Sequence, residues 1–296
     1  GMIRGILAPV DGCERSEAIL PYVAALSNRL SADVTLLHVF PASLHAQRDA
    51  HVAYVETVSA QLRQRLCRPD IDVDGVALEG MPHRVIADYA AREEVGLIAV
   101  APHSQTSDGH WSIGRTADKV IRETSKPVLL AGAVRHRDSG TIPLISRIVV
   151  PLDGSRASRD VLSHVESLLP LDNHGQDGLV WLIHVLPAEH YAAGPVIAKR
   201  VRYEKAEMEE LQGQATRYLE EVATKLRAKG RDIAIRVAVG DAAEMIMRTA
   251  TEVEANLIAM ATHGYSGFNR LFLGSVAERV MHHATVPLLL VKPVNY

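Results

Sequence analysis

Short apolar runs bounded by polar turns alternate along the chain with longer segments in which apolar residues recur at helical spacing. Apolar runs of roughly four to eight residues predict buried strands, and the helical spacing predicts amphipathic helices. In the first part of the chain, the predicted strands span residues 3–10, 34–39, 73–78, 97–100 and 127–130, and a long helical stretch spans 51–68.

The same succession of elements returns in the second part of the chain. Its predicted strands span residues 148–152, 180–185, 233–239, 257–260 and 287–291, and its long helical stretch spans roughly 197–229. The first strand of each part leads into a Pro-x-Asp-Gly turn, which contains Asp11 in one part and Asp153 in the other. From the fourth strand onward the offset between matching residues is constant, so we infer an internal duplication.

The alternation of strands and helices predicts, in each half, an open five-stranded parallel sheet with helices on both faces. A chain of 296 residues also exceeds the usual size of one domain. We expect one domain over residues 1–131, a linker without periodicity over 132–146, and a second domain over 147–296. Ligands of such sheets lie beyond the carboxyl ends of the strands, where the first and fourth strands should flank the reversal of strand order.

A glycine-containing loop joins the fourth strand of the second half to the last helix. It begins with Ala261-Thr262-His263-Gly264 and ends, nine residues later, with Gly274-Ser275. Glycines let backbone amides approach an anion closely, and the start of a helix favours phosphate. Ser275 and Glu278 fit a capping box for that helix. A well-capped turn without a ligand explains the same residues, so phosphate binding and a structural turn both stay open here.

Composition argues against several classes of partner and site. The formal net charge of −3 gives no electrostatic footprint for nucleic acid or a membrane surface. Two cysteines, Cys13 and Cys67, support neither a disulfide framework nor a Cys-rich zinc site. No apolar run approaches the roughly 20 residues that span a bilayer, and the N-terminus lacks a signal-peptide pattern, so we expect a cytoplasmic protein. His38 and His184 lack metal-spaced partners, and we interpret them as structural.

The loop pattern resembles the nucleotide loop of the universal stress protein family, in which Gly-x-x-Gly, nine residues and Gly-Ser/Thr follow a strand. The first glycine of that pattern is Ala261 in this chain, a small substitute. The resemblance extends over both halves and implies a tandem member with two Rossmann-like domains of the adenine nucleotide alpha hydrolase type. It implies ATP, AMP or ADP as the ligand, with Mg²⁺ as an optional companion of the phosphates.

The resemblance also assigns roles to residues of the second half. It implies that Asp153, which follows Pro151, contacts the nucleotide near its ribose and base, and that the backbone of Val185 meets the adenine. The residues implied to surround the sugar and the phosphates are Met260, Ala261, His263, Gly264, Gly274, Ser275 and Val276. Asp153 could equally cap its own turn, and His263 could be a solvated loop residue.

The corresponding loop of the first half departs from the family pattern. Ser104 replaces the second glycine and restricts positive φ, and Arg115 replaces the Ser/Thr with a long side chain that fills phosphate space. Pro102 and Trp111 stiffen and crowd the loop further. We therefore expect the first half to bind nucleotide poorly or not at all, although Asp11 is retained. Arg115 could instead recruit another anion.

The short apolar fifth strands of the two halves would invite aggregation if they were exposed at sheet edges. In the family such strands pair two domains edge to edge. The resemblance therefore implies that the two halves pair through these strands within one chain. Dimerisation of the whole chain is a further possibility.

Three functions fit these residues. The leading hypothesis is a non-enzymatic, cytoplasmic sensor or regulatory module of the stress response that binds an adenine nucleotide in its second half. An alternative is a slow nucleotide hydrolase on the same fold, although the sequence contains no Gly-x4-Gly-Lys-Ser/Thr phosphate loop. A third is a partner-binding scaffold whose nucleotide site is vestigial.

Overall fold

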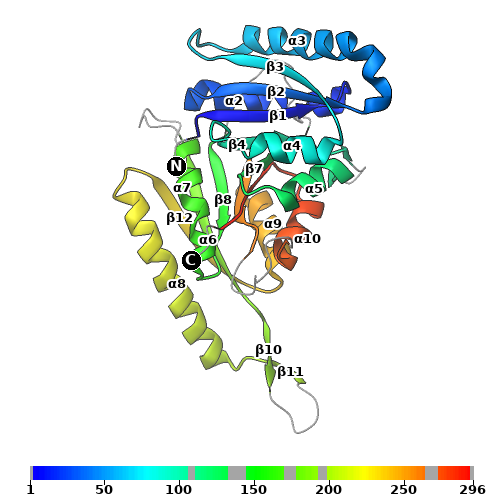
Figure 1. Cartoon of the computed structure of the whole chain (residues 1–296). Helices are drawn as coiled ribbons and strands as arrows, with labels where there is room; N and C mark the ends of the chain where they lie inside the picture. Colours follow the sequence, from blue (N-terminus) through cyan, green and yellow to red (C-terminus); the bar gives the residue numbers. More distant parts are fainter. Residues whose placement is uncertain are drawn as a thin grey trace.

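Ten strands from both halves of the chain form one sheet, and helices cover both of its faces (Figure 1). The computed structural model describes residues 3–105, 111–132, 145–169, 178–192, 199–263 and 273–293. The sheet strands of the first half are β1 (Gly5–Val10), β2 (Asp33–Phe40), β3 (Val73–Glu79), β4 (Leu97–Val100) and β7 (Val128–Leu130). Those of the second half are β8 (Arg147–Pro151), β9 (Leu179–Leu186), β12 (Asp232–Val239), β13 (Leu257–Ala261) and β14 (Leu288–Val291).

Helices connect the strands in the predicted alternation. The first half contains α1 (Glu14–Glu17), α2 (Leu20–Leu30), the 3-10 helix η1 (Ala42–Gln47), α3 (Arg48–Arg65), α4 (Pro82–Ala90) and α5 (Arg115–Glu123). The second half contains α6 (Arg156–Arg159), α7 (Val161–Leu168), α8 (Lys205–Arg227), α9 (Ala242–Glu252) and α10 (Ser275–His283). Two small hairpins complete the structure: β5 (Ser104–Gln105) pairs with β6 (Trp111–Ser112), and β10 (Glu189–Ala192) pairs with β11 (Lys199–Arg202).

Each half has the strand order third, second, first, fourth, fifth, and all neighbours within a half are parallel. The second half repeats this arrangement with β12, β9, β8, β13 and β14. The predicted class of two parallel, helix-covered α/β units is therefore confirmed. The strand order reverses between β1 and β4 and between β8 and β13, as the sequence predicted.

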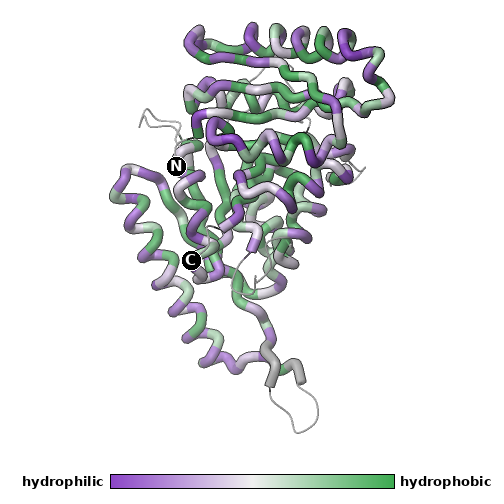
Figure 2. The backbone as a smooth tube through the Cα atoms, viewed as in Figure 1, coloured by the Kyte–Doolittle hydropathy of each residue, from purple (hydrophilic) through white to green (hydrophobic). Residues whose placement is uncertain are grey.

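The sheet separates two apolar cores. One core packs α2, α3, α7 and α8 against one face, and the other packs α4, α5, α9 and α10 against the opposite face. Figure 2 shows apolar positions concentrated in the strands and hydrophilic positions recurring along α3 and α8, which agrees with amphipathic helices on a buried sheet. The strand β4, for example, is buried at every residue.

The helical stretch predicted over residues 197–229 begins later than expected. Residues Lys199–Arg202 form β11 of a hairpin that lies apart from the ten-stranded sheet (Figure 1). The helix α8 starts after Glu204, because Glu204 and Glu207 form a capping box that satisfies backbone amides at that point. The prediction missed this boundary because a polar hairpin and a polar helix have similar composition.

The two histidines that we interpreted as structural each form a hydrogen bond with the backbone at the carboxyl end of the first strand of their half. His38 Nδ1 lies 2.9 Å from the Val10 carbonyl oxygen, and His184 Nδ1 lies 2.7 Å from that of Leu152. A carbonyl only accepts, so each Nδ1 carries the donated proton. The described part of the chain contains no group of three or more side chains arranged to hold a metal ion. Within the same ranges, no helix is both long and apolar enough to cross a lipid bilayer.

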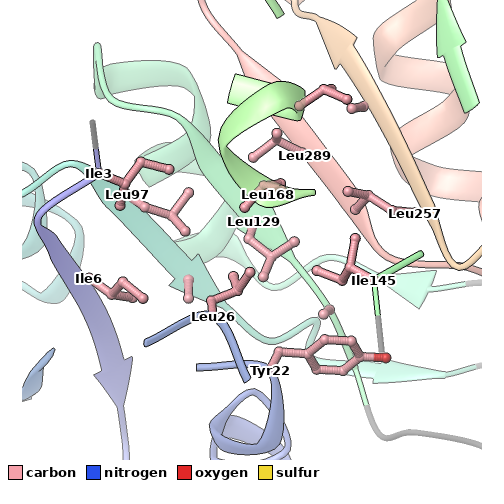
Figure 3. Close-up of a cluster of buried hydrophobic side chains, with 14 of the residues drawn as sticks. Ile3, Ile6, Tyr22, Leu26, Leu97, Leu129, Ile145, Leu168, Leu257 and Leu289 are labelled. Atoms are coloured by element: carbon pink, nitrogen blue, oxygen red, sulfur yellow. The ribbon is translucent and has the colours of Figure 1, made fainter. Parts of the chain in front are cut away.

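The edge strands of the two halves meet at the centre of the sheet. β14 pairs antiparallel with β7, with Leu289 opposite Leu129, and both side chains are fully buried. Figure 3 shows Leu129 and Leu289 in one cluster that joins side chains from both halves. The apolar core is therefore continuous across the junction.

Polar contacts reinforce the same junction. Arg122 of α5 bonds Asp118 on its own helix and Glu278 on α10, the latter at 2.8 Å. These carboxylates, Asp118 first, raise the pKa of Arg122. Lys292, which follows β14, donates to the carbonyl oxygen of Arg122. On the opposite face, Arg29 of α2 donates to the carbonyl oxygen of Leu168 at 2.6 Å.

Replacing Leu129 with alanine should lower the free energy of unfolding by about 2–5 kcal/mol, because it removes a fully buried side chain from the joined core. Urea unfolding of the purified chain measures the change. The control is Val201→Ala on the outlying hairpin, where the side chain is exposed and the expected change is within about 0.5 kcal/mol. Equal stabilities for the two variants would contradict the central position of this strand pair.

Candidate functional site

A cavity of about 260 Å³ opens at the carboxyl ends of β8 and β13, where the strand order of the second half reverses. Its floor consists of apolar side chains at strand ends and on α9, among them Ile183, Ile246 and Met260. The start of α10 forms one wall. This is the position at which open parallel sheets bind ligands.

All of the predicted site residues that the structure describes lie around this one cavity. They are Pro151, Asp153, Val185, Met260, Ala261, His263, Gly274, Ser275 and Val276. Gly264 lies outside the described residues. Their contact with a ligand stays a prediction, but they come from four separate segments of the chain that only folding brings together.

Sequence reasoning missed several residues of the cavity wall. Ile183, Ala242 and Ile246 contribute apolar surface, and Ser158 and Thr262 contribute hydroxyl groups. Thr262 lies inside the predicted loop pattern at a position that the pattern leaves open. The amphipathic spacing of α9 could have placed Ile246 on a buried face, but no local signal tells which buried residues border a cavity.

Asp153 both caps its turn and borders the cavity. Its Oδ1 accepts hydrogen bonds from the backbone amide of Ser155 at 2.9 Å and from the hydroxyl of Ser155 at 2.6 Å. Ser155 in turn caps α6 by accepting from the amide of Ser158. Asp153 therefore caps its own turn, as the sequence analysis considered. It is compatible with a ligand contact, because an ionised carboxylate has two acceptor oxygens.

His263 presents a buried nitrogen atom at the cavity wall. Its Nδ1 lies 3.1 Å from the hydroxyl oxygen of Thr262, and its Nε2 is buried without a hydrogen-bond partner among the described residues. Burial lowers the pKa of His263, and the nearby Lys292 lowers it further. A buried polar atom without a partner is unusual in a folded protein, and a ligand atom is one way to satisfy it.

The helix α10 starts one residue earlier than a Ser275 cap requires. Gly274 is the N-cap, its amide donates to the Thr262 carbonyl oxygen at 2.8 Å, and its own carbonyl accepts from the Glu278 amide. The predicted capping box of Ser275 with Glu278 is therefore wrong, because Ser275 is already helical and Glu278 pairs with Arg122. The correction places the hydroxyl of Ser275 and the first amides of α10 beside the cavity.

Close approach explains the glycine at this N-cap. A Cβ atom added to Gly274 would lie 3.1 Å from the Thr262 carbonyl oxygen, which is tighter than ordinary contact. The chain therefore brings the end of β13 and the start of α10 together at one edge of the cavity. That edge offers donors: backbone amides, two hydroxyl groups and an imidazole.

Both halves of the chain match one protein family. The sequence profile of the Universal stress protein family matches residues 2–132 and again residues 145–292. A universal stress protein of Mycolicibacterium smegmatis is 22% identical over 304 residues, which cover 98% of this chain and 97% of that protein. One from Methanocaldococcus jannaschii is 32% identical over 149 residues, which cover 50% of this chain and 83% of that protein.

The fold is also found among solved structures. A universal stress protein from Archaeoglobus fulgidus superposes with a TM-score of 0.73 at 20% sequence identity, and the match covers 99% of both chains. A Pseudomonas aeruginosa protein of unknown function superposes with a TM-score of 0.68 at 17% identity, covering 98% of this chain and 93% of the other. At these identities the likeness concerns the fold alone.

The stability of the protein should fall as the pH drops through about 6.5, where an unperturbed histidine titrates. The folded-state pKa of His263 is lowered, so the unfolded chain takes up its proton first and unfolding becomes easier in acid. The stability is complete above the unfolded pKa and declines below it. His164 has a lowered pKa through burial and contributes with the same sign.

Urea unfolding at several pH values between about 8 and about 5.5 tests this dependence. His263→Asn should reduce the acid-induced loss of stability without removing it. The matched control is His103→Asn, which changes the exposed residue at the same place in the first-half loop and should keep the wild-type profile. A wild-type profile for His263→Asn would show that this imidazole is not a source of the pH dependence.

Proposed function

Because this chain belongs to the universal stress protein family, with one copy of the family domain in each half, we propose that its second half binds an adenine nucleotide. The ligand is ATP, ADP or AMP, and the chain acts as a sensor or regulatory module in the stress response. The observation that carries the proposal is the cavity between β8 and β13, which among the described residues has apolar side chains at one end and helix amides, hydroxyl groups and an imidazole at the other.

The apolar end suits a planar base. Ile183 and Val185 on β9 and Met260 on β13, the strands on either side of β8, border it, and Ile246 borders it from α9. The ladder between β8 and β9 ends at Pro151 and Ile183, so Val185 lies beyond its last pair. Backbone groups at such a position can form hydrogen bonds with the polar edge of a heterocycle. Ligand cavities of this kind combine apolar walls with a few fixed polar groups.

The middle of the cavity suits a ribose. The carboxylate of Asp153 stands at the end of β8 and is held by its turn through Ser155. His184 supports this strand end, because its imidazole donates to the carbonyl of Leu152, the residue before the aspartate. Ribose hydroxyls can donate to the carboxylate.

The donor-rich end suits phosphates. The amides at the start of α10, the hydroxyls of Ser275 and Thr262, and the Nε2 atom of His263, which has no partner among the described residues, border the same space. The helix dipole adds a positive potential there. Helix amides, hydroxyl groups and the helix dipole attract phosphate, and they do so here without a lysine or an arginine among the described residues of the cavity wall.

The contacts of α10 support a regulatory role. The helix begins at the cavity and carries Glu278, which bonds Arg122 of the first half. A ligand that orders the start of α10 therefore acts on an element that is paired across the junction. In this proposal, the pairing of β7 with β14 within one chain is the second link between the halves. A homodimer of whole chains is compatible with the proposal.

Calorimetric titration of the nucleotide-stripped chain with ATP tests the binding proposal, and one site per chain is expected. Ser275→Glu should weaken ATP binding by about 100-fold, because like charges a few Å apart in a cleft repel by a few kcal/mol. The substitution leaves α10 stable, since acidic residues favour the first turn of a helix. The matched control is Arg115→Glu at the same position in the first half, which should leave the affinity unchanged.

Two results would count against the binding proposal. A wild-type chain that does not bind ATP, ADP or AMP excludes the nucleotide ligand. Equal ATP affinity in wild type and Ser275→Glu places the phosphates away from the start of α10.

Hydrogen exchange tests the regulatory part separately. Saturating ATP should slow amide exchange in α5 of the first half, because a stabilised α10 holds Arg122 more firmly. Glu278→Gln removes the charge that pairs with Arg122 and lies outside the cavity wall, so it should bind ATP normally and lose the response in α5. If ATP binds and α5 exchanges at an unchanged rate, the nucleotide is bound without signalling to the first half.

A further inference from the structure

The first half contains a second cavity, of about 230 Å³, at the place where its own strand order reverses. The residues at its apolar end stand at the same positions of the repeat as those of the second-half cavity. They are Pro9, Asp11, Val39, Val100 and Ala101, which match Pro151, Asp153, Val185, Met260 and Ala261. The end proposed to hold base and ribose is therefore present twice in the chain.

The phosphate end is not repeated. In the second half, Thr262, His263, Gly274 and Ser275 border the cavity, whereas none of their counterparts in the first half is among the described residues that line its cavity. The described parts of the first-half loop instead pair with each other as β5 and β6, and the His103 amide donates to the Ser112 carbonyl at 2.8 Å. That amide is thereby used within the loop rather than offered to an anion.

The two halves also differ at the N-cap of the helix that follows the third strand. In the second half, Asp241 caps α9 and bonds Arg279 of α10 at 2.6 Å. The matching residue is Met81, which gives α4 no side-chain cap and leaves its side chain 55% exposed beside the lining residue Pro82. The loss of an N-cap side chain lowers the free energy of unfolding by about 1 kcal/mol. An exposed methionine side chain does not add to the stability of the unliganded protein. A methionine is, however, an adaptable contact for an apolar ring.

We propose that the first-half cavity is a second ligand site, which takes an uncharged nucleoside, a base with its ribose and no phosphates. The proposal rests on the proposed function, because it assigns base and ribose to the end that the two cavities share. Asp11 supplies the acceptor for ribose hydroxyls: its Oδ1 already accepts from the Cys13 amide, as Asp153 does from Ser155. Thr116 adds a hydroxyl at the start of α5.

The consequence is a chain with two related sites of different charge preference. One site accepts a nucleotide, and the other accepts the dephosphorylated form. Since α5 and α10 begin at the two cavities and are bonded through Arg122 and Glu278, both ligands act on the same pair of helices.

The test uses the full chain with either cavity filled by a larger side chain. Ala101→Leu fills the first cavity and Ala261→Leu fills the second, and these alanines occupy the same position of the repeat. Calorimetry with adenosine and with ATP is done on each variant and on the double variant. Ala261→Leu should bind one adenosine per chain and bind ATP at least about tenfold more weakly, since none of the described residues that match Thr262, His263, Gly274 and Ser275 lines the first cavity to receive the phosphates. The double variant should bind neither.

Absence of adenosine binding in Ala261→Leu would overturn the proposal, and so would equal affinity for adenosine and ATP. Adenosine binding by the double variant would place the nucleoside elsewhere and overturn it too. Failure of the proposed function is seen separately, as loss of ATP binding in Ala101→Leu, whose second cavity is unaltered. If a leucine variant does not fold, Asp11→Ala takes the place of Ala101→Leu, and Asp153→Ala takes the place of Ala261→Leu. Asp11→Ala should weaken adenosine binding several-fold while ATP binding stays unchanged.

Discussion

The antiparallel pairing of β7 with β14 joins two parallel sheets into one and decides where most other parts of the molecule lie. Each of these strands is short, apolar and at the edge of its own half, so either half alone would expose an edge that invites association. Pairing the two edges buries Leu129 and Leu289 and makes the apolar core continuous. The duplication thus supplies, within one chain, the partner that each edge strand needs.

The same pairing brings the two ligand-facing helices together. α5 and α10 follow the fourth strands, begin at the two cavities and lie next to each other at the junction (Figure 1). Arg122 and Glu278 connect them directly, and Lys292 adds a contact from the end of β14. α10 also packs against β6, which belongs to the first-half loop. The described part of the first-half loop therefore supports the helix that begins at the other cavity.

The two halves share one scaffold and differ in the loop after the fourth strand and in one helix N-cap. Strand ends and buried faces are alike, because packing against a parallel sheet demands the same small and apolar residues in each half. The carboxylate after the first strand is also alike, and in each half it accepts a hydrogen bond from the backbone amide two residues further on. The loop after the fourth strand and the N-cap residue of the helix after the third strand are free of that demand. Ser104, Arg115 and Met81 stand there in one half, and Gly264, Ser275 and Asp241 in the other.

The sequence by itself determined the duplication and the alternation of strands and helices, because short-range patterns carry this information, and the family resemblance supplied part of the residues around the second-half cavity. Buried parallel strands read as apolar runs, and a glycine loop after a strand has a recognisable spacing. The start of α8 was misjudged, since polarity alone does not separate a hairpin from a helix. The cap at Gly274 was missed by one residue, because the contact of Gly274 with the Thr262 carbonyl and the pairing of Glu278 with Arg122 of the other half are tertiary contacts. Only the tertiary structure decided which buried side chains border a cavity, that the Nε2 atom of His263 has no partner among the described residues, and that the first half contains a second cavity. These features depend on contacts between residues far apart in the chain, which no local pattern records.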